Sequence, residues 1–115
     1  MENTDLSSFV YYRTYSRWLS DLGRRETWGE TVDRFMGWAF SPTKIDSELQ
    51  KEIREAIFSK SIMPSMRALW SAGKNAEREN VSIYNCSFLP IDCVRAFSEA
   101  LYILMQGTGV GYSVE

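Results

Sequence analysis

Histidine is absent from this chain of 115 residues, and cysteine occurs only twice. Without histidine, the chain lacks the commonest general base and the commonest metal-ligating side chain. Two cysteines alone are too few ligands for a structural zinc site. We therefore expect no metal centre formed by this chain and no acid–base catalysis by an imidazole.

Long apolar runs are absent as well. No stretch approaches the roughly 18 residues of a transmembrane helix, and residues 1–9 lack the basic and apolar regions of a signal peptide. The 13 basic and 15 acidic residues are well mixed, which argues against a dedicated nucleic-acid or membrane surface. We expect a cytoplasmic protein without nucleic-acid or membrane partners, whose Cys86 and Cys93 stay reduced unless redox chemistry is their function.

Helical patterns dominate the first two thirds of the sequence. Polar capping residues precede two runs in which apolar side chains recur at helical spacing, and Pro64 disfavours helix in the residue before it. The patterns predict irregular aromatic structure at 1–23, helices beginning with capping boxes at 27–30 and 47–50, and a polar loop at 71–80.

The C-terminal residues predict a strand, a helix and a second strand, with the strands at 82–89 and 110–114. Asp92 is the expected N-cap of the helix, and Gly107 is its expected end. The side of this helix that we expect to be buried carries Val94, Phe97, Leu101, Leu104 and Met105.

A strand–helix–strand unit implies a parallel pair with a right-handed crossover. Parallel sheets are normally covered on both faces. Here the sequence predicts only two parallel strands, preceded by helices, so the sheet looks incomplete. The sequence therefore predicts an α/β fold, with a mostly helical region at 1–80 followed by an incomplete α/β domain at 81–115.

Three short stretches contain residues that could carry chemistry. A buried structural role is the commoner one for a free cysteine such as Cys86, but its polar neighbours Asn85 and Ser87 shift the balance toward a strand end that lines a site. Residues 107–111 contain three glycines, which let a ligand approach the backbone closely, but a tight helix-to-strand turn explains them equally well. Residues 63–70 predict a turn at Pro64 and Ser65, a structural Arg67, and core positions for Leu69 and Trp70.

Together and in this order, the stretches resemble class II ribonucleotide reductases, and the monomeric, adenosylcobalamin-dependent triphosphate reductases are the most similar. The resemblance covers nearly the whole chain. It is carried by residues 13–17 (RTYSR), 26–31 (ETWGET), 64–70 (PSMRALW), 85–88 (NCSF) and 107–113 (GTGVGYS).

The resemblance implies a ten-stranded α/β barrel that begins at residue 81, behind the helical region. It also implies thiyl-radical replacement of the ribose 2′-hydroxyl by hydrogen, with two further cysteines as reductants. Cys86 matches the first of these two, so its redox disulfide forms with a cysteine outside this chain. Adenosylcobalamin starts the radical chemistry and is bound mainly by the rest of the enzyme.

The same resemblance places four other residues at the ribonucleotide substrate: Ser65, Asn85, Thr108 and Gly109. It implies two protein partners, the remaining reductase barrel polypeptide and a thioredoxin-type reductant. The radical cysteine and the second reducing cysteine lie beyond this chain, so we expect no activity from the chain alone. Cys93 matches none of the family's cysteines.

Two other classes of protein remain open from the residues alone. One is a stand-alone module that binds and regulates a reductase, which would have a sealed surface. The other is a small thiol redox protein using Cys86 and Cys93, although their spacing is not Cys-x-x-Cys.

Overall fold

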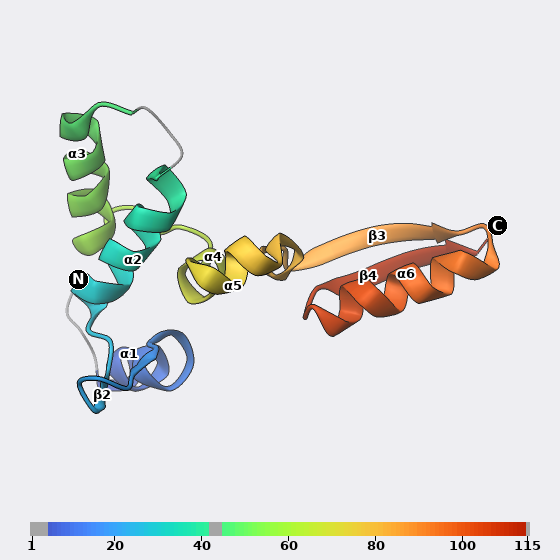
Figure 1. Cartoon of the computed structure of the whole chain (residues 1–115), viewed down its shortest axis with the longest axis horizontal. Helices are drawn as coiled ribbons and strands as arrows, with labels where there is room; N and C mark the ends of the chain where they lie inside the picture. The colour runs from blue at the N-terminus through green and yellow to red at the C-terminus, as the bar shows by residue number, and fades with distance from the viewer. Residues whose placement is uncertain (1–4, 42–44, 115) are drawn as a thin grey trace. The chain divides into compact units, whose positions relative to one another are not determined.

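The computed structural model describes residues 5–41 and 45–114, and the chain divides into two compact units, Met1–Gly73 and Lys74–Glu115 (Figure 1). This division lies seven residues ahead of the boundary that we expected between 80 and 81. None of the helices in the described residues is both long and apolar enough to cross a bilayer.

The first unit is built from helices, with one very short antiparallel strand pair. Its elements are α1 (Asp5–Val10), the π-helix η1 (Tyr11–Tyr15), β1 (Trp18–Leu19), β2 (Arg24–Arg25), α2 (Trp28–Phe40), α3 (Ser47–Phe58) and α4 (Met66–Ser71). The expectation of irregular structure at 1–23 was therefore wrong for 5–15, which is helical, and for the short strand β1, while residues 1–4 lie outside the described residues. Side chains of this segment hydrogen-bond to residues of 26–31, and such contacts leave no periodic pattern.

The capping box predicted ahead of α2 is confirmed. The Thr27 side chain accepts from the Glu30 backbone N–H, and the Glu30 carboxylate accepts from the Thr27 backbone N–H. The second box is wrong by one residue, because Asp46 is the N-cap of α3 and accepts from the N–H of Glu48. Asp and Ser are about equally good N-caps, so composition could not choose between Asp46 and Ser47.

The core of the first unit lies where α3 and α4 pack on α2. Val32, Ile57 and Leu69 are each at most 2% exposed. Trp70, which we expected in the core beside Leu69, is 45% exposed. The two neighbours point to different sides of α4, and only one side faces this core.

The second unit contains α5 (Lys74–Arg78), the 3-10 helix η2 (Asn80–Ile83), β3 (Cys86–Ile91), α6 (Val94–Met105) and β4 (Gly109–Val114). The predicted loop at 71–80 is wrong in part: α4 runs to Ser71, α5 fills 74–78, and Ala76 is buried. β3 begins at Cys86, four residues later than the predicted strand at 82–89. The residues ahead of it form η2 instead, where the Glu79 carboxylate accepts from the Val81 N–H and the Glu79 carbonyl oxygen accepts from the Ser82 hydroxyl.

β3 and β4 form the predicted parallel pair, with α6 connecting them and packing on both. α6 ends as expected, with Gly107 at a φ of 87°. Its N-cap is Cys93 rather than Asp92, and no side chain bonds to the helix start. The prediction of a buried face on α6 was wrong: the five apolar side chains assigned to it are 52–86% exposed, and only Ala96 is buried.

The exposure of α6 has a simple cause. Two strands offer it too narrow a surface, and in the part of the chain that the structure describes β3 and β4 pair only with each other. The α/β order of the sequence prediction is confirmed in this unit. The continuation into a ten-stranded barrel remains a prediction.

Candidate functional site

The predicted site residues of the second unit meet at the amino ends of β3 and β4. The parallel register places Cys86 opposite Gly109. The backbone N–H of Gly109 donates to the carbonyl of Asn85 at 3.0 Å. Two segments 23 positions apart in the sequence are thus joined where Asn85, Cys86 and Gly109 lie together.

Thr108 is part of this junction, but its side chain points inward. It is 1% exposed, and its hydroxyl lies 2.7 Å from the Val81 carbonyl oxygen and 2.9 Å from that of Tyr84. These contacts tie the start of β4 to the segment ahead of β3. The contact of Thr108 with a substrate stays a prediction, and it would have to use the backbone, because the hydroxyl is engaged within the chain.

Cys86 lies on a sheet face that nothing in its unit covers. Side chains alternate across a strand, so the register groups Cys86 and Phe88 with Gly109 and Gly111 on one face. The Cys86 thiol is free and exposed, and Phe88 is 68% exposed. This open face, defined by these four residues, presents an accessible thiol beside a strip of bare backbone.

Neither the backbone conformation nor the packing within this chain requires glycine at the two glycine positions of the open face. Neither has a positive φ, and a Cβ would meet the Asn85 carbonyl oxygen at 3.5 Å from Gly109, or the Phe88 ring at 3.7 Å from Gly111. Both are ordinary van der Waals distances. Glycine weakens a strand interior and often marks close approach by a ligand or another backbone, which is the explanation that remains.

A substitution of Gly109 should therefore impair function without lowering stability. Gly109→Ala should leave the free energy of unfolding unchanged or raise it by about 0.5 kcal/mol, because alanine restricts the unfolded chain. In a complete enzyme the added methyl group should lower kcat/KM, because it occupies space on the open face. Urea denaturation and steady-state kinetics measure the two effects, and unaltered kinetics would contradict the interpretation.

Cys86 and Cys93 cannot pair with each other. Five residue steps of β3 separate Cys86 from Ile91, a distance of about 16 Å at ~3.3 Å per residue. The two remaining residues can bring the chain back by at most about 7 Å. A disulfide needs Cα atoms within about 7 Å, so the geometry argues against a redox protein that uses these two cysteines as a pair.

Ser65, the remaining predicted site residue, belongs to the first unit. It is exposed and is the N-cap of α4, where its hydroxyl oxygen accepts from the N–H of Ala68 at 3.5 Å. The structure assigns no turn to Pro64 and Ser65, which instead directly precede α4. The contact of Ser65 with a substrate stays a prediction.

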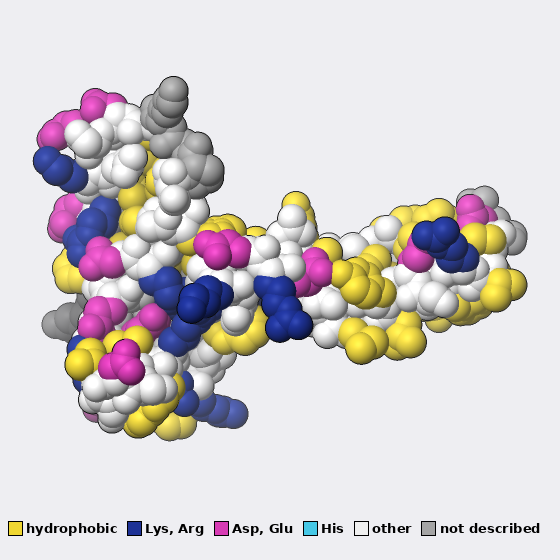
Figure 2. Space-filling model, viewed as in Figure 1, with side chains coloured by type: hydrophobic (Ala, Val, Ile, Leu, Met, Phe, Trp, Pro, Cys, Tyr) yellow, Lys and Arg dark blue, Asp and Glu magenta, His cyan; other side chains and the backbone are white. Residues whose placement is uncertain are grey.

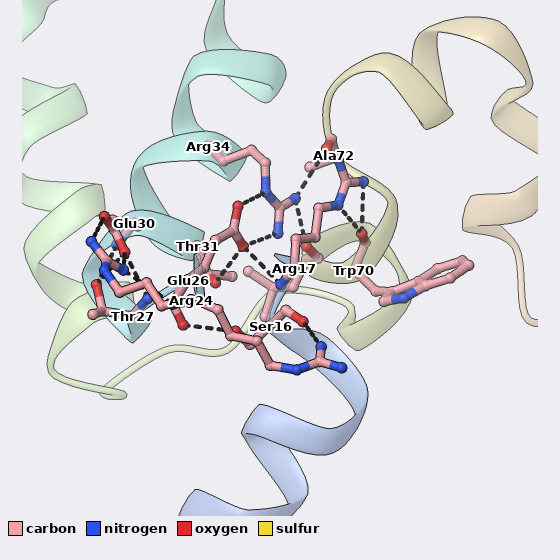
Figure 3. A network of polar contacts seen from close by, with 12 residues as sticks. Ser16, Arg17, Arg24, Glu26, Thr27, Glu30, Thr31, Arg34, Trp70 and Ala72 are labelled. Atoms are coloured by element: carbon pink, nitrogen blue, oxygen red, sulfur yellow. Dashed lines mark hydrogen bonds and ion pairs between the residues drawn. The ribbon is translucent and has the colours of Figure 1, made fainter. Parts of the chain in front are cut away.

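A buried ion pair in the first unit went unnoticed in the sequence (Figure 3). The Arg34 guanidinium donates from Nε to Oε1 of Glu26 at 2.8 Å and from Nη2 to Oε2 at 2.9 Å. The Thr31 hydroxyl and the Arg17 backbone N–H also donate to Glu26 Oε2. The Glu26 side chain is 5% exposed and that of Arg34 17%.

Burial by itself would raise the pKa of Glu26, but the hydrogen bonds and charge of Arg34 outweigh it and hold that pKa below its ordinary value. The carboxylate is thus charged at neutral pH. Glu26 and Arg34 are eight residues apart, and their pairing leaves no periodic pattern. The one signal was that Glu26 begins the stretch 26–31, which carried part of the family resemblance.

No cluster of metal-ligating side chains accompanies either set of residues. Within 5–41 and 45–114, no group of three or more Cys, Asp or Glu side chains is placed to hold a metal ion. At the amino ends of β3 and β4, the described residues offer the accessible thiol of Cys86 and neutral hydrogen-bonding groups.

Known proteins similar to this chain agree on one family. The family model of the ribonucleotide reductase alpha domain matches residues 2–74. The adenosylcobalamin-dependent ribonucleoside-triphosphate reductase of Lacticaseibacillus paracasei is 35% identical over 144 residues, covering 96% of this chain and 19% of that protein. The reductase of the same description from Lactobacillus leichmannii is 32% identical over 138 residues, covering 91% and 19%.

A solved structure agrees with these relatives. The crystal structure of a B12-dependent (class II) ribonucleotide reductase matches this chain with a TM-score of 0.69 at 29% identity. The match covers 91% of this chain and 19% of that one, so the chain spans about a fifth of the length of its relatives. Because the family model matches more than half of its residues, this chain belongs to the ribonucleotide reductase alpha-domain family.

Proposed function

We propose that this chain forms the N-terminal part of an adenosylcobalamin-dependent ribonucleotide reductase and contributes Cys86 as one of its two reducing thiols. The observation that carries the proposal is the open face, on which an accessible Cys86 lies opposite Gly109 at the amino ends of two parallel strands. Relatives that match nearly the whole chain are described as adenosylcobalamin-dependent ribonucleoside-triphosphate reductases.

The proposed role of Cys86 is a two-electron reduction shared with a second cysteine outside this chain. The ribose carbon loses its 2′-hydroxyl as water and gains hydrogen, while two thiols lose two electrons and two protons and become a disulfide. A thioredoxin-type dithiol then restores the thiols by exchange. Because Cys93 lies too far from Cys86 to be its partner, the second thiol comes from the rest of the enzyme.

Substrate contacts are proposed for residues at the amino ends of the two strands and for Ser65. Asn85 is exposed beside Cys86 and can donate and accept hydrogen bonds. Gly109 and Thr108 would contribute backbone groups, because Gly109 has no side chain and the Thr108 hydroxyl is engaged within the chain. The substrate class is a ribonucleotide.

Adenosylcobalamin supplies the radical that starts the reaction. The described residues contain no cluster of cobalt-ligating side chains, and the sequence has no histidine. We propose that the cofactor is bound mainly by other parts of the enzyme. What this chain provides is the reducing thiol and one wall of the substrate site.

The second unit also supports the proposal of a larger barrel. Both faces of a parallel sheet are normally covered, yet here the open face is bare and the apolar side of α6 is exposed. A stand-alone regulatory module would be expected to bury these side chains. We infer that the remaining barrel polypeptide covers them, in an interface of about 2,000 Å² or more if it is a separate chain.

Reconstitution tests this proposal. We expect the chain to co-purify with a polypeptide that contains the remaining barrel, and the pair to reduce ribonucleoside triphosphates only when adenosylcobalamin and a dithiol are added. Each polypeptide assayed alone is the control and should be inactive. A compact monomer that melts cooperatively and does not bind the complementary polypeptide would instead favour the stand-alone module.

A further inference from the structure

Two arginines hold the C-terminal end of α4 (Figure 3). Arg34 Nη1 donates to the carbonyl oxygens of Leu69 and Ala72, both at 3.0 Å. Arg17 donates to the Trp70 carbonyl oxygen from Nε at 3.2 Å and from Nη2 at 2.9 Å. Three carbonyl groups at the end of one short helix are thus bound by guanidinium groups from other segments, and we call this set of contacts the α4 clamp.

The α4 clamp depends on the ion pair between Glu26 and Arg34. The bidentate contact uses Nε and Nη2 of Arg34 and leaves Nη1 directed at the two carbonyl groups. Glu26 also receives the backbone N–H of Arg17. One carboxylate therefore holds Arg34 and the backbone of Arg17 in place, and both arginine side chains reach α4.

α4 has little means of holding its position unaided. It contains six residues, whereas isolated helices shorter than about 12 residues are marginal in water. Its N-cap bond from the Ala68 N–H to Ser65 is long, at 3.5 Å. The clamp and the burial of Ala68, Leu69, Ser71 and Ala72 are therefore its main anchors. Because α4 is only about 9 Å long at 1.5 Å per residue, Ser65 at its start is close to the clamped end.

We propose that Arg34 is a positioning residue that acts through α4 to place the hydroxyl of Ser65 at the substrate. This inference rests on the proposed function, in which Ser65 contacts the ribonucleotide. Lysine cannot replace Arg34 in this role, because a single ammonium group cannot match the planar guanidinium that binds a carboxylate and two carbonyl groups together.

A double-mutant cycle tests the inference in the complete enzyme. Ser65→Ala, Arg34→Lys and the double variant are compared by steady-state kinetics on a ribonucleoside triphosphate, with active sites titrated. Arg34→Lys should lower kcat/KM about tenfold in the parent and less than about twofold in the Ser65→Ala background. Arg34→Lys should also change the same kinetic parameter, KM or kcat, that Ser65→Ala changes.

The matched control is Arg54→Lys. Arg54 also pairs with a residue of α2, at 2.6 Å from Asp33, but it comes from α3 and is not part of the α4 clamp. It should leave both parameters within about twofold of the parent. If the parental enzyme reduces nucleotides but the Arg34 and Ser65 substitutions lower kcat/KM independently of each other, this inference is overturned and the proposed function stands. An inactive parent overturns both.

Hydrogen exchange of the full chain adds a readout that does not require activity. The Leu69 N–H donates to the Ser65 carbonyl and the Ala72 N–H to that of Ala68. Arg34→Lys should raise the exchange rates of these two amides about tenfold and leave those of α3 unchanged. Unchanged exchange at Leu69 and Ala72 would show that Arg34 does not hold α4, and so overturn the inference.

Discussion

Cys86→Ser is expected to abolish multiple-turnover reduction by the complete enzyme, with a loss of about a hundredfold or more in kcat. A serine hydroxyl cannot form a disulfide, so each substrate would lack one of its two electron donors. The exposed thiol on the open face of β3 and β4 is the structural basis. The measurement is deoxyribonucleotide formed per enzyme in the presence of excess dithiol.

The matched control for this prediction is Cys93→Ser. Cys93 is also exposed, but it lies beyond the far end of β3 from Cys86 and precedes α6 without bonding to the helix start. This variant should keep at least half of the parental turnover. If the Cys86 variant turns over as fast as the parent with the same dithiol, Cys86 is not a reducing thiol.

Glu26→Ala is expected to lower the free energy of unfolding of the first unit by about 3 kcal/mol. Removing one partner of a buried ion pair leaves the other charge uncompensated, which typically costs roughly 3–5 kcal/mol. The low end of that range applies because the Arg34 side chain is 17% exposed, so solvent reaches part of its charge. Urea denaturation, followed by tryptophan fluorescence, measures the change.

Asp33→Ala is the control for this second prediction. The pair of Asp33 and Arg54 is exposed, with side chains 56% and 37% accessible. Such surface pairs contribute at most about 1 kcal/mol, so the loss should be correspondingly small. Equal losses in the two variants would contradict a special role for the buried pair.

The pH dependence of stability should show the same contribution. The pKa of Glu26 is lowered in the folded chain, so its contribution is present above the unfolded pKa of about 4.5 and is lost as the pH falls through the folded value. The contribution of Glu30 to stability is lost in acid in the same way, since the hydrogen bond from Arg24 lowers the pKa of Glu30 to about 2. Glu26→Gln should therefore reduce, without abolishing, the acid loss of stability in thermal melts.

Local signals in the sequence were sufficient where one segment decides its own structure. The capping box of α2 formed as expected, because Thr27 and Glu30 satisfy each other's backbone within one turn. Gly107 ended α6, where the positive φ of 87° suits a residue without Cβ. Boundaries failed where neighbouring residues compete for one role, as Asp46 and Ser47 did at the start of α3.

The sequence by itself determined α2, α3, the order β3–α6–β4 with its parallel strand pair, and the candidate thiol, because these follow from residues close together in the chain. Only the tertiary structure decided that Thr108 turns inward, that Glu26 and Arg34 form a buried pair, and that the apolar side of α6 is left exposed. These features depend on which distant segments meet. Periodicity shows that a face is apolar, but it cannot show whether the same chain supplies the surface that covers it.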